Sequence, residues 1–340
     1  MWHHLVWNFC KDMSCVENFL AGKSVLVSGG TGFVGKCLVE KLLRSCPSVK
    51  NIYILIRNKR NGKIVKFLWV IVFNVASTEN AHQRYKKFID HVVSREENLT
   101  KKNILSYWKL FALKAFDTIR KLFPESLLKL KVISGDVSSE GLGISHDDEL
   151  ELIENVGIIF HCAAVVRFDF SLMDVMKTNV LGTHRILELA EKMKHFVSFI
   201  YVSTTFSQSY QSSLEERYYS TGFDVFALMN SIKANDKQSI DAVEKKWEVY
   251  FKRPMNSIKC FWFLIGRLFQ KGHPSTYTMS KAFAEELIYN YGFKLPVAIV
   301  RPSIIVGAFM SPEPGYVQGL QVNNKQFNYH VVKASNEVFV

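Results

Sequence analysis

The sequence predicts an α/β fold in which a parallel sheet is covered by helices on both faces. Short, almost wholly apolar runs recur along the chain, and segments with apolar residues at helical spacing separate them. Strands that are buried on both faces have this composition, and a helical crossover usually joins parallel neighbours. With 340 residues, 48% of them hydrophobic, the chain is long enough for one large domain of this kind.

Six apolar runs, each bounded by polar or turn-forming residues, are the predicted strands. In chain order they are 24–28, 51–57, 131–134, 156–161, 197–203 and 296–301. Apolar residues at helical spacing predict helices between them. These helices are expected at 32–44, 172–193 and 276–291. The alternation of strands and helices predicts a doubly wound sheet.

A glycine-rich turn, GGTGFVG, follows the first predicted strand and begins the first helix. Its three spaced glycines allow a tight turn, close approach of a pyrophosphate, and packing of helix on strand. The helix N-terminus then presents unpaired N–H groups to the phosphates. In this context the motif indicates a Rossmann-type dinucleotide site, and a purely structural loop is the alternative. The predicted cofactor contacts here are Gly29, Thr31, Gly32, Phe33, Val34 and Gly35.

The residue at the end of the second strand bears on the choice of cofactor. An acidic side chain there would bind the ribose 2′-hydroxyl of NAD. Arg57 occupies this place instead, with Lys59 and Arg60 behind it. A guanidinium suits a 2′-phosphate, so we expect NADPH, and a solvated basic loop is the alternative.

Further cofactor contacts are predicted at other strand ends, because ligands of open α/β sheets bind there. They are Asp136 and Val137 after the third strand, Ala163 and Ala164 after the fourth, and Asn179 in the helix that follows. His161 ends the fourth strand. We expect its side chain to be packed there and not to act as a general base.

A Y-x-x-x-K pair, Tyr277 and Lys281, lies on the last predicted helix. The four-residue spacing places both side chains on one face. We expect the ammonium to lower the pKa of the phenol, so that Tyr277 exchanges a proton near neutral pH, and to hold ribose hydroxyls of the cofactor. Ser203, Thr204 and Thr205 end the fifth strand, where a hydroxyl can bind a substrate carbonyl. The dinucleotide turn, the hydroxyl and the pair occur in the order that carbonyl reduction needs.

Several segments together resemble one family. They are AGKSVLVSGGTGFVGK, IYILIR, GDVSSEGLG, ENVGIIFHCAAVVRFD, YVSTT, YTMSKAFAEEL and IVRPSIIVGA. Over residues 19–316, apart from two apolar stretches, the chain resembles the N-terminal domain of eukaryotic alcohol-forming fatty acyl-CoA reductases, within the extended short-chain dehydrogenase superfamily. The resemblance implies NADPH-dependent reduction of a long-chain fatty acyl-CoA to an alcohol through an aldehyde, with release of CoA.

The same resemblance implies roles for individual residues. Tyr277 matches the proton donor, Lys281 its partner, and Thr204 the hydroxyl that orients the carbonyl. The residues that match the loop beside the nicotinamide amide are Pro302, Ser303 and Ile305.

The chain also departs from the family pattern. We expect an N-terminal extension at 1–18, a reductase domain at 19–316 with apolar insertions near 63–78 and 258–270, and an atypical tail at 317–340, with the family's C-terminal region missing. The apolar stretches 64–75 and 261–269 are shorter than the ~18 residues needed to span a bilayer. They are interpreted as buried elements, as membrane-dipping segments, or as wrongly joined sequence.

The net charge and the cysteine pattern bear on the partners and the compartment of the protein. The 43 basic and 31 acidic residues give a net charge of +12, which fits a phosphate-rich cofactor or an anionic membrane. Without long basic runs or a zinc-finger pattern, nucleic acid is not expected as a partner, nor is a metal site. The six cysteines form no C-x-x-C pair, as in a reduced compartment. No signal peptide is recognised, and the resemblance implies endoplasmic reticulum or peroxisomal membranes facing the cytosol.

Two rival functions stay open at this point. The first is another extended short-chain enzyme, such as a sugar-nucleotide epimerase or a hydroxysteroid dehydrogenase. The second is a catalytically inactive nucleotide-binding remnant that retains only the fold. Arg57 and the VRFD run favour the acyl-CoA reading over the first, and the intact Tyr277–Lys281 pair argues against the second.

Overall fold

The six predicted strands form one parallel sheet in the computed structural model, which describes residues 15–57, 114–168, 170–209, 211, 213–246, 275–305 and 307–308. The strands are β1 (Ser24–Ser28), β2 (Ile52–Ile56), β3 (Leu130–Ser134), β4 (Val156–His161), β5 (Ser198–Val202) and β6 (Val297–Val300). Their order across the sheet is β3-β2-β1-β4-β5-β6, and every pairing is parallel. This is the Rossmann order, so the predicted fold class is confirmed.

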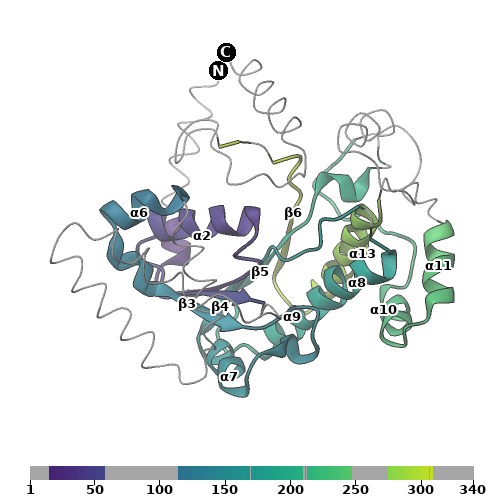
Figure 1. The fold of residues 1–340 in the computed structure, drawn as a ribbon, viewed down its shortest axis with the longest axis horizontal. Coiled ribbons are helices and arrows are strands. Elements are labelled where there is room, and N and C mark those ends of the chain that lie inside the picture. The colour runs from purple at the N-terminus through teal and green to yellow at the C-terminus, as the bar shows by residue number, and fades with distance from the viewer. Residues whose placement is uncertain are drawn as a thin grey trace, which may run out of the picture.

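Helices cover both faces of the sheet. The longer ones are α2 (Phe33–Ser45), α6 (Asp117–Leu122), α7 (His146–Asn155), α8 (Leu172–Asn179), α9 (Leu181–Lys192), α10 (Val225–Lys233), α11 (Lys237–Lys246) and α13 (Thr276–Tyr291). Short 3-10 turns connect them at η1 (Lys114–Phe116), η2 (Pro124–Lys129), η3 (Glu140–Gly143) and η4 (Thr205–Gln208). Figure 1 shows α2 and α6 on one side of the sheet, with α8, α9 and α13 on the other.

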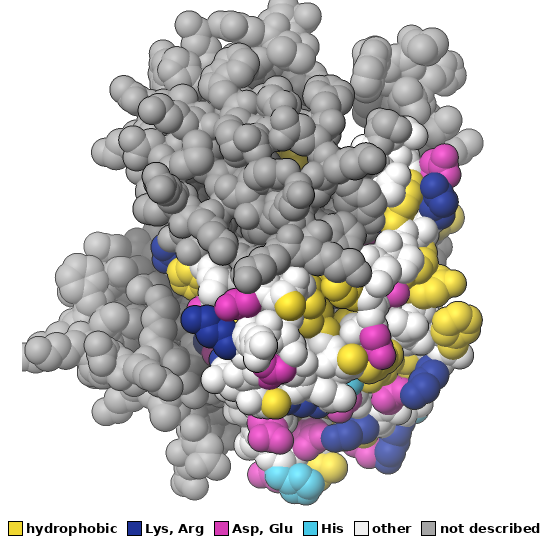
Figure 2. All heavy atoms as spheres, turned by 90° about the vertical axis from the view of Figure 1, so that its right-hand side faces the viewer, with side chains coloured by type: hydrophobic (Ala, Val, Ile, Leu, Met, Phe, Trp, Pro, Cys, Tyr) yellow, Lys and Arg dark blue, Asp and Glu magenta, His cyan; other side chains and the backbone are white. Residues whose placement is uncertain are grey.

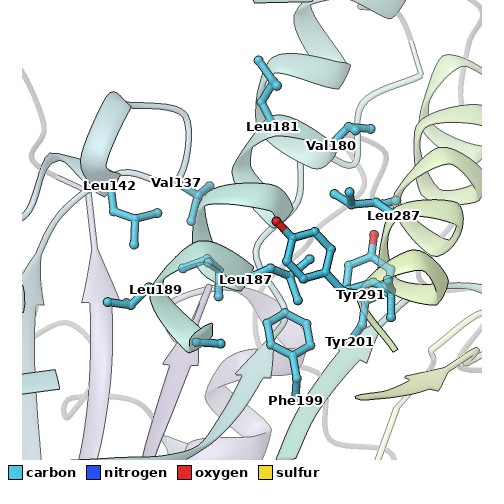
Figure 3. Packing of buried hydrophobic residues seen from close by; sticks show 14 of the residues in the cluster. Val137, Leu142, Val180, Leu181, Leu187, Leu189, Phe199, Tyr201, Leu287 and Tyr291 are labelled. Carbon is cyan, nitrogen blue, oxygen red and sulfur yellow. The ribbon is translucent and has the colours of Figure 1, made fainter. Parts of the chain in front are cut away.

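Each face of the sheet buries its own hydrophobic core, because neighbouring side chains of a strand point to opposite faces. Val25 and Val27 of β1 pack with α2 and α6, whereas Leu26 packs with α8, α9 and α13. In the second core, side chains from α9, α13 and β5 meet over the sheet, Leu187, Leu287 and Phe199 among them (Figure 3). Full burial of one such side chain contributes about 1.5–3 kcal/mol.

The helices differ from prediction in two respects. The single helix expected at 172–193 is two helices, α8 and α9, that meet at Val180, where φ is −103° and ψ −59°. Helices α6, α7, α10 and α11 were not predicted. Two of them have a local N-terminal signal: Ser145 caps α7 by accepting from the Asp148 amide, and Asp224 caps α10 by accepting from the amides of Phe226 and Ala227.

Several predictions concern residues outside the described ranges. These are the apolar stretches at 64–75 and 261–269, the tail at 317–340, most of the N-terminal extension, and Lys59 and Arg60. Among the helices that the structure does describe, none is long and apolar enough to cross a membrane.

Acidic and basic side chains are interspersed on the face shown in Figure 2. Ion pairs on the described surface join some of them, for example Lys192 with Glu149 at 2.7 Å. On the part of this face that the structure describes, the positive surplus therefore does not gather into one patch.

Candidate active site

The glycine turn lies where the sheet reverses its strand order, between β1 and β4. Gly29 has a φ of +73°, which an L side chain rarely adopts. A Cβ added to it would lie 2.6 Å from the Ala163 amide nitrogen and 2.8 Å from the Ala163 Cα. The turn and the loop after β4 are thus in backbone contact, and the switch point is where α/β sheets bind ligands.

The N-terminus of α2 fits an anion. Gly32 is its N-cap, no side chain caps it, and no acidic residue lies in its first turn. A Cβ on Gly35 would lie 2.2 Å from the Gly29 carbonyl oxygen, so this close packing of turn and helix requires glycine. The first N–H groups of the helix, including those of Phe33 and Val34, keep their capacity to bind phosphate oxygens. The arrangement fits a dinucleotide pyrophosphate.

The remaining predicted contacts of the adenosine half lie at the ends of β2 and β3. Arg57 is exposed directly after β2. The Asp136 carboxylate accepts from the amide and hydroxyl of Ser138 at 2.8 and 2.7 Å, which fixes the turn after β3. Val137 is 5% exposed, and its carbonyl accepts from Arg185 at 3.1 Å. With strands ~4.8 Å apart, β3 and β5 lie about 19 Å apart across the sheet, which suits an elongated ligand.

Asn179 connects the loop after β4 to α13. Its Oδ1 accepts from the Val165 amide at 2.8 Å, and its Nδ2 donates to the Val165 carbonyl at 3.2 Å and to Ser280 Oγ at 2.9 Å. The Ser280 hydroxyl donates to the Tyr277 carbonyl at 2.7 Å. Asn179 therefore braces the loop that carries Ala163 and Ala164 against the helix of the Y-x-x-x-K pair, and its predicted contact with the cofactor stays a prediction.

His161 is packed at its strand end, as expected. It is fully buried between Ser28 Oγ, 2.5 Å from Nδ1, and Thr183 Oγ1, 2.9 Å from Nε2. Thr183 donates to the Asn179 carbonyl at 2.7 Å, so Nε2 must donate to Thr183, and Nδ1 accepts from Ser28. Burial, with Lys281 nearby, lowers the pKa of His161 to about 3, so the ring is neutral.

Lys281 is buried beneath the end of β5. Its Nζ donates to the Val202 carbonyl at 2.7 Å and lies 4.5 Å from the centre of the Tyr201 ring. Burial lowers the pKa of this ammonium to about 8, and Cys162 and Glu285 act against that shift. The Lys281 side chain thus connects α13 directly to β5, the strand that leads to Thr204.

The expected lowering of the Tyr277 pKa is wrong for this structure. Burial raises the pKa of the phenol to about 12. Tyr277 packs edge-on against Phe168 at 5.8 Å between ring centres, while the Lys281 ammonium is engaged by the Val202 carbonyl. A protonated phenol is nevertheless the form that can give a proton to a developing oxyanion, which is what a reduction requires.

Thr204 caps the 3-10 turn η4, which packs against α13. Its Oγ1 accepts from the Phe206 amide at 3.3 Å, and an oxygen that accepts can still donate its own hydrogen to a ligand. The Pro302 carbonyl accepts from the Thr205 amide at 3.0 Å, so the segment after β6 contacts the start of the η4 turn. Ser303 and Ile305 in that segment are exposed.

Sequence reasoning missed a buried carboxylate next to these residues. Glu285 is 0% exposed and accepts hydrogen bonds from Ser203, Ser207, Gln208 and Arg301. Its signal was present in the helix period, because Tyr277, Lys281 and Glu285 follow at four-residue steps on one helix face.

Fold, glycine turn and helix terminus together define a dinucleotide-binding α/β domain. The sequence matches the family described as male sterility protein, an NAD-binding family, over residues 27–335, and the chain belongs to that family. A nicotinamide dinucleotide is therefore the class of cofactor that the family binds. The choice between NADPH and NADH stays a prediction.

Fatty acyl-CoA reductases are among the curated relatives that the sequence matches. Fatty acyl-CoA reductase 1 of Xenopus laevis is 33% identical over 305 residues, which cover 90% of this chain and 47% of the relative. The protein of the same name from Homo sapiens is 31% identical with the same coverage. The chain spans about half the length of the curated relatives it matches. Among solved structures, the terminal R domain from the myxalamid PKS-NRPS biosynthetic pathway is 21% identical with a TM-score of 0.48, covering 84% of this chain and 50% of that one.

Proposed function

We propose that residues 19–316 form a reductase domain that uses NADPH to reduce a long-chain fatty acyl-CoA to the alcohol. The observation that carries the proposal is the packing of α13, with Tyr277 and Lys281, against the end of β5 and the Thr204 turn, beside a glycine turn that fits a pyrophosphate. The names of the relatives support the substrate class. The exposed Arg57 supports the preference for NADPH.

The proposed chemistry needs a hydrogen-bonded carbonyl and a proton donor. When bound, the cofactor supplies the hydride that adds to the carbonyl carbon. Thr204 and Tyr277 donate hydrogen bonds to the carbonyl oxygen, and Tyr277 passes its proton to that oxygen as negative charge develops. The resulting hemithioacetal breaks its carbon–sulfur bond, releasing CoA as the thiol and leaving an aldehyde. Tyr277 would pass a second proton to the aldehyde oxygen, and with a second hydride, which the bound cofactor would again supply, the product is the alcohol.

An apolar loop beside Tyr277 supports a lipid substrate. Val166, Phe168 and Phe170 in the loop after β4 are 62%, 38% and 37% exposed, and Phe168 contacts the Tyr277 ring. The Arg167 guanidinium lies 4.4 Å from the centre of the Phe170 ring. Exposed apolar side chains next to a reacting group favour an apolar ligand over a sugar nucleotide.

The proposed cellular location of this activity rests on the family resemblance. We propose that the protein acts at the cytosolic face of endoplasmic reticulum or peroxisomal membranes, through peripheral contact. Subcellular fractionation of the full chain, with washing of membranes at high salt, measures this association.

Oxidation of NADPH with acyl-CoAs of 12 to 24 carbons tests the function, with product analysis for aldehyde and alcohol. We expect turnover with long chains, none with UDP-sugars, and alcohol as the final product. Tight NADPH binding without oxidation on any acyl-CoA would instead identify an inactive nucleotide-binding remnant.

A further inference from the structure

Glu285 joins the three parts of the chain that surround the proposed proton-transfer site. On α13 it lies one turn after Lys281, and its carboxylate receives hydrogen bonds from η4 and from the residue after β6. Ser207 Oγ lies 2.7 Å away, Gln208 Nε2 2.8 Å, and Arg301 Nη2 2.8 Å, while Ser203 donates from the end of β5. Every partner is a donor, which is the pattern that an ionised carboxylate requires.

The partners of Glu285 enclose Thr204 in the sequence. Ser203 precedes it and Ser207 follows it, and Ser207 Oγ also lies 2.7 Å from the Thr204 carbonyl oxygen. Arg301 is held in turn by its donation to the Arg217 carbonyl at 3.1 Å. The turn that presents the Thr204 hydroxyl is thereby fixed to α13 at a carboxylate from which water is excluded.

Glu285 is also one of the two acidic groups that oppose the lowering of the Lys281 pKa within the described part of the chain, and the thiol of Cys162 is the other. The other ionisable groups around Lys281 are His161, Cys162, Tyr201 and Tyr277. Burial lowers the pKa of His161 to about 3 and raises those of Cys162 and Tyr277 to about 11 and 12, and it raises the pKa of Tyr201 well above its usual range. All four are neutral near pH 8, whereas the Glu285 carboxylate favours the protonated lysine.

We propose that Glu285, paired with Arg301, is a positioning residue of the reductase: it holds the Thr204 turn against α13 and sustains the charge of Lys281. This inference rests on the proposed function, in which Thr204 and Tyr277 act on the carbonyl and Lys281 lies one turn further along α13. A buried ion pair that served the fold alone would stabilise the domain without altering the chemistry of its neighbours.

Two substitutions separate geometry from charge. Glu285→Gln removes the charge and keeps the shape, so we expect kcat to fall by about 10- to 100-fold. Without the carboxylate the pKa of Lys281 should fall further, so the alkaline limb of the pH profile, where kcat declines as Lys281 loses its proton, should move to lower pH. Glu285→Asp keeps the charge and shortens the reach, so kcat should fall while the limb stays in place. Glu286→Gln is the matched control. Its carboxylate accepts from the amide and hydroxyl of Thr221 instead, and the variant should keep both kcat and limb.

NADPH affinity by cofactor fluorescence and the melting temperature are measured for every variant alongside turnover. If Glu285→Gln fails to fold, Ser207→Ala removes the hydroxyl that contacts Glu285 and the Thr204 carbonyl but leaves the carboxylate in place, and kcat should still fall with an unchanged limb. A Glu285→Gln protein that melts earlier but keeps the wild-type kcat and pH profile overturns the inference. Absence of turnover in the wild type refutes the proposed function instead. NADPH affinity measured against pH then decides the inference. We expect binding to weaken as Lys281 loses its proton above about pH 8, and Glu285→Gln should move this weakening to lower pH. If the substitution leaves the pH dependence of binding unchanged, the inference is overturned.

Discussion

Gly29→Ala tests the contact on which the cofactor site is built. The new Cβ would lie 2.6, 2.8 and 2.9 Å from backbone atoms of Ala163 and Cys162, none of which can move as a flexible side chain would. A left-handed alanine costs about 1–2 kcal/mol, and overpacking against a fixed neighbour costs about 1–3 kcal/mol. The free energy of unfolding should therefore fall by about 2–5 kcal/mol. NADPH affinity should fall as well, since the turn must shift to relieve the clash.

Gly22→Ala is the matched control for this experiment. Its φ of +69° is close to that of Gly29, but the added Cβ has no described atom within 4 Å. This variant should lose only the cost of a left-handed alanine, about 1–2 kcal/mol of the free energy of unfolding. NADPH affinity should stay at the wild-type value. Urea unfolding followed by circular dichroism gives both energies. Equal losses of stability in the two variants would refute the close approach of the turn to the loop after β4.

Two further predictions concern pH. Turnover should fall as the pH rises through about 8, because burial lowers the Lys281 pKa to that value and the protonated amine is the form expected to hold the ribose hydroxyls of the cofactor; a rate that stays flat to pH 10 would contradict this. Acid should unfold the domain through His161. Its folded pKa of about 3 lies below the ordinary 6.5, so the unfolded chain alone takes up the proton and stability is lost as the pH falls between these values, by up to about 5 kcal/mol. His161→Phe should flatten that loss while costing about 1–3 kcal/mol at neutral pH, because Ser28 loses its acceptor, and an unchanged acid slope would count against the assignment.

The strands could be predicted from sequence because burial on both faces leaves a continuous apolar run. The glycine turn could be predicted because its backbone geometry excludes other residues. Helix α7 was not predicted, because a polar helix with Leu152 as its buried residue shows little apolar periodicity. The capping serine before it was the available signal.

The site was predicted as a set of residue types but not as an electrostatic environment. The four-residue spacing placed Tyr277 and Lys281 on one helix face, but the sign of the Tyr277 pKa shift depends on burial and on which acceptor Lys281 finds. Both are properties of packing across β5. The Glu285–Arg301 pair likewise joins two segments 16 residues apart in the chain. The helix period could predict that Glu285 shares a face with Lys281, but it could not predict that Arg301 would pair with it.

The measurement that bears most directly on the whole account compares wild type with Tyr277→Phe in a single assay of NADPH binding and acyl-CoA turnover. Removal of the phenolic oxygen should leave the dissociation constant for NADPH within about twofold, a difference of about 0.4 kcal/mol, and stop alcohol formation. If the phenylalanine variant produced alcohol as fast as the wild type, proton donation from this helix would have to be abandoned.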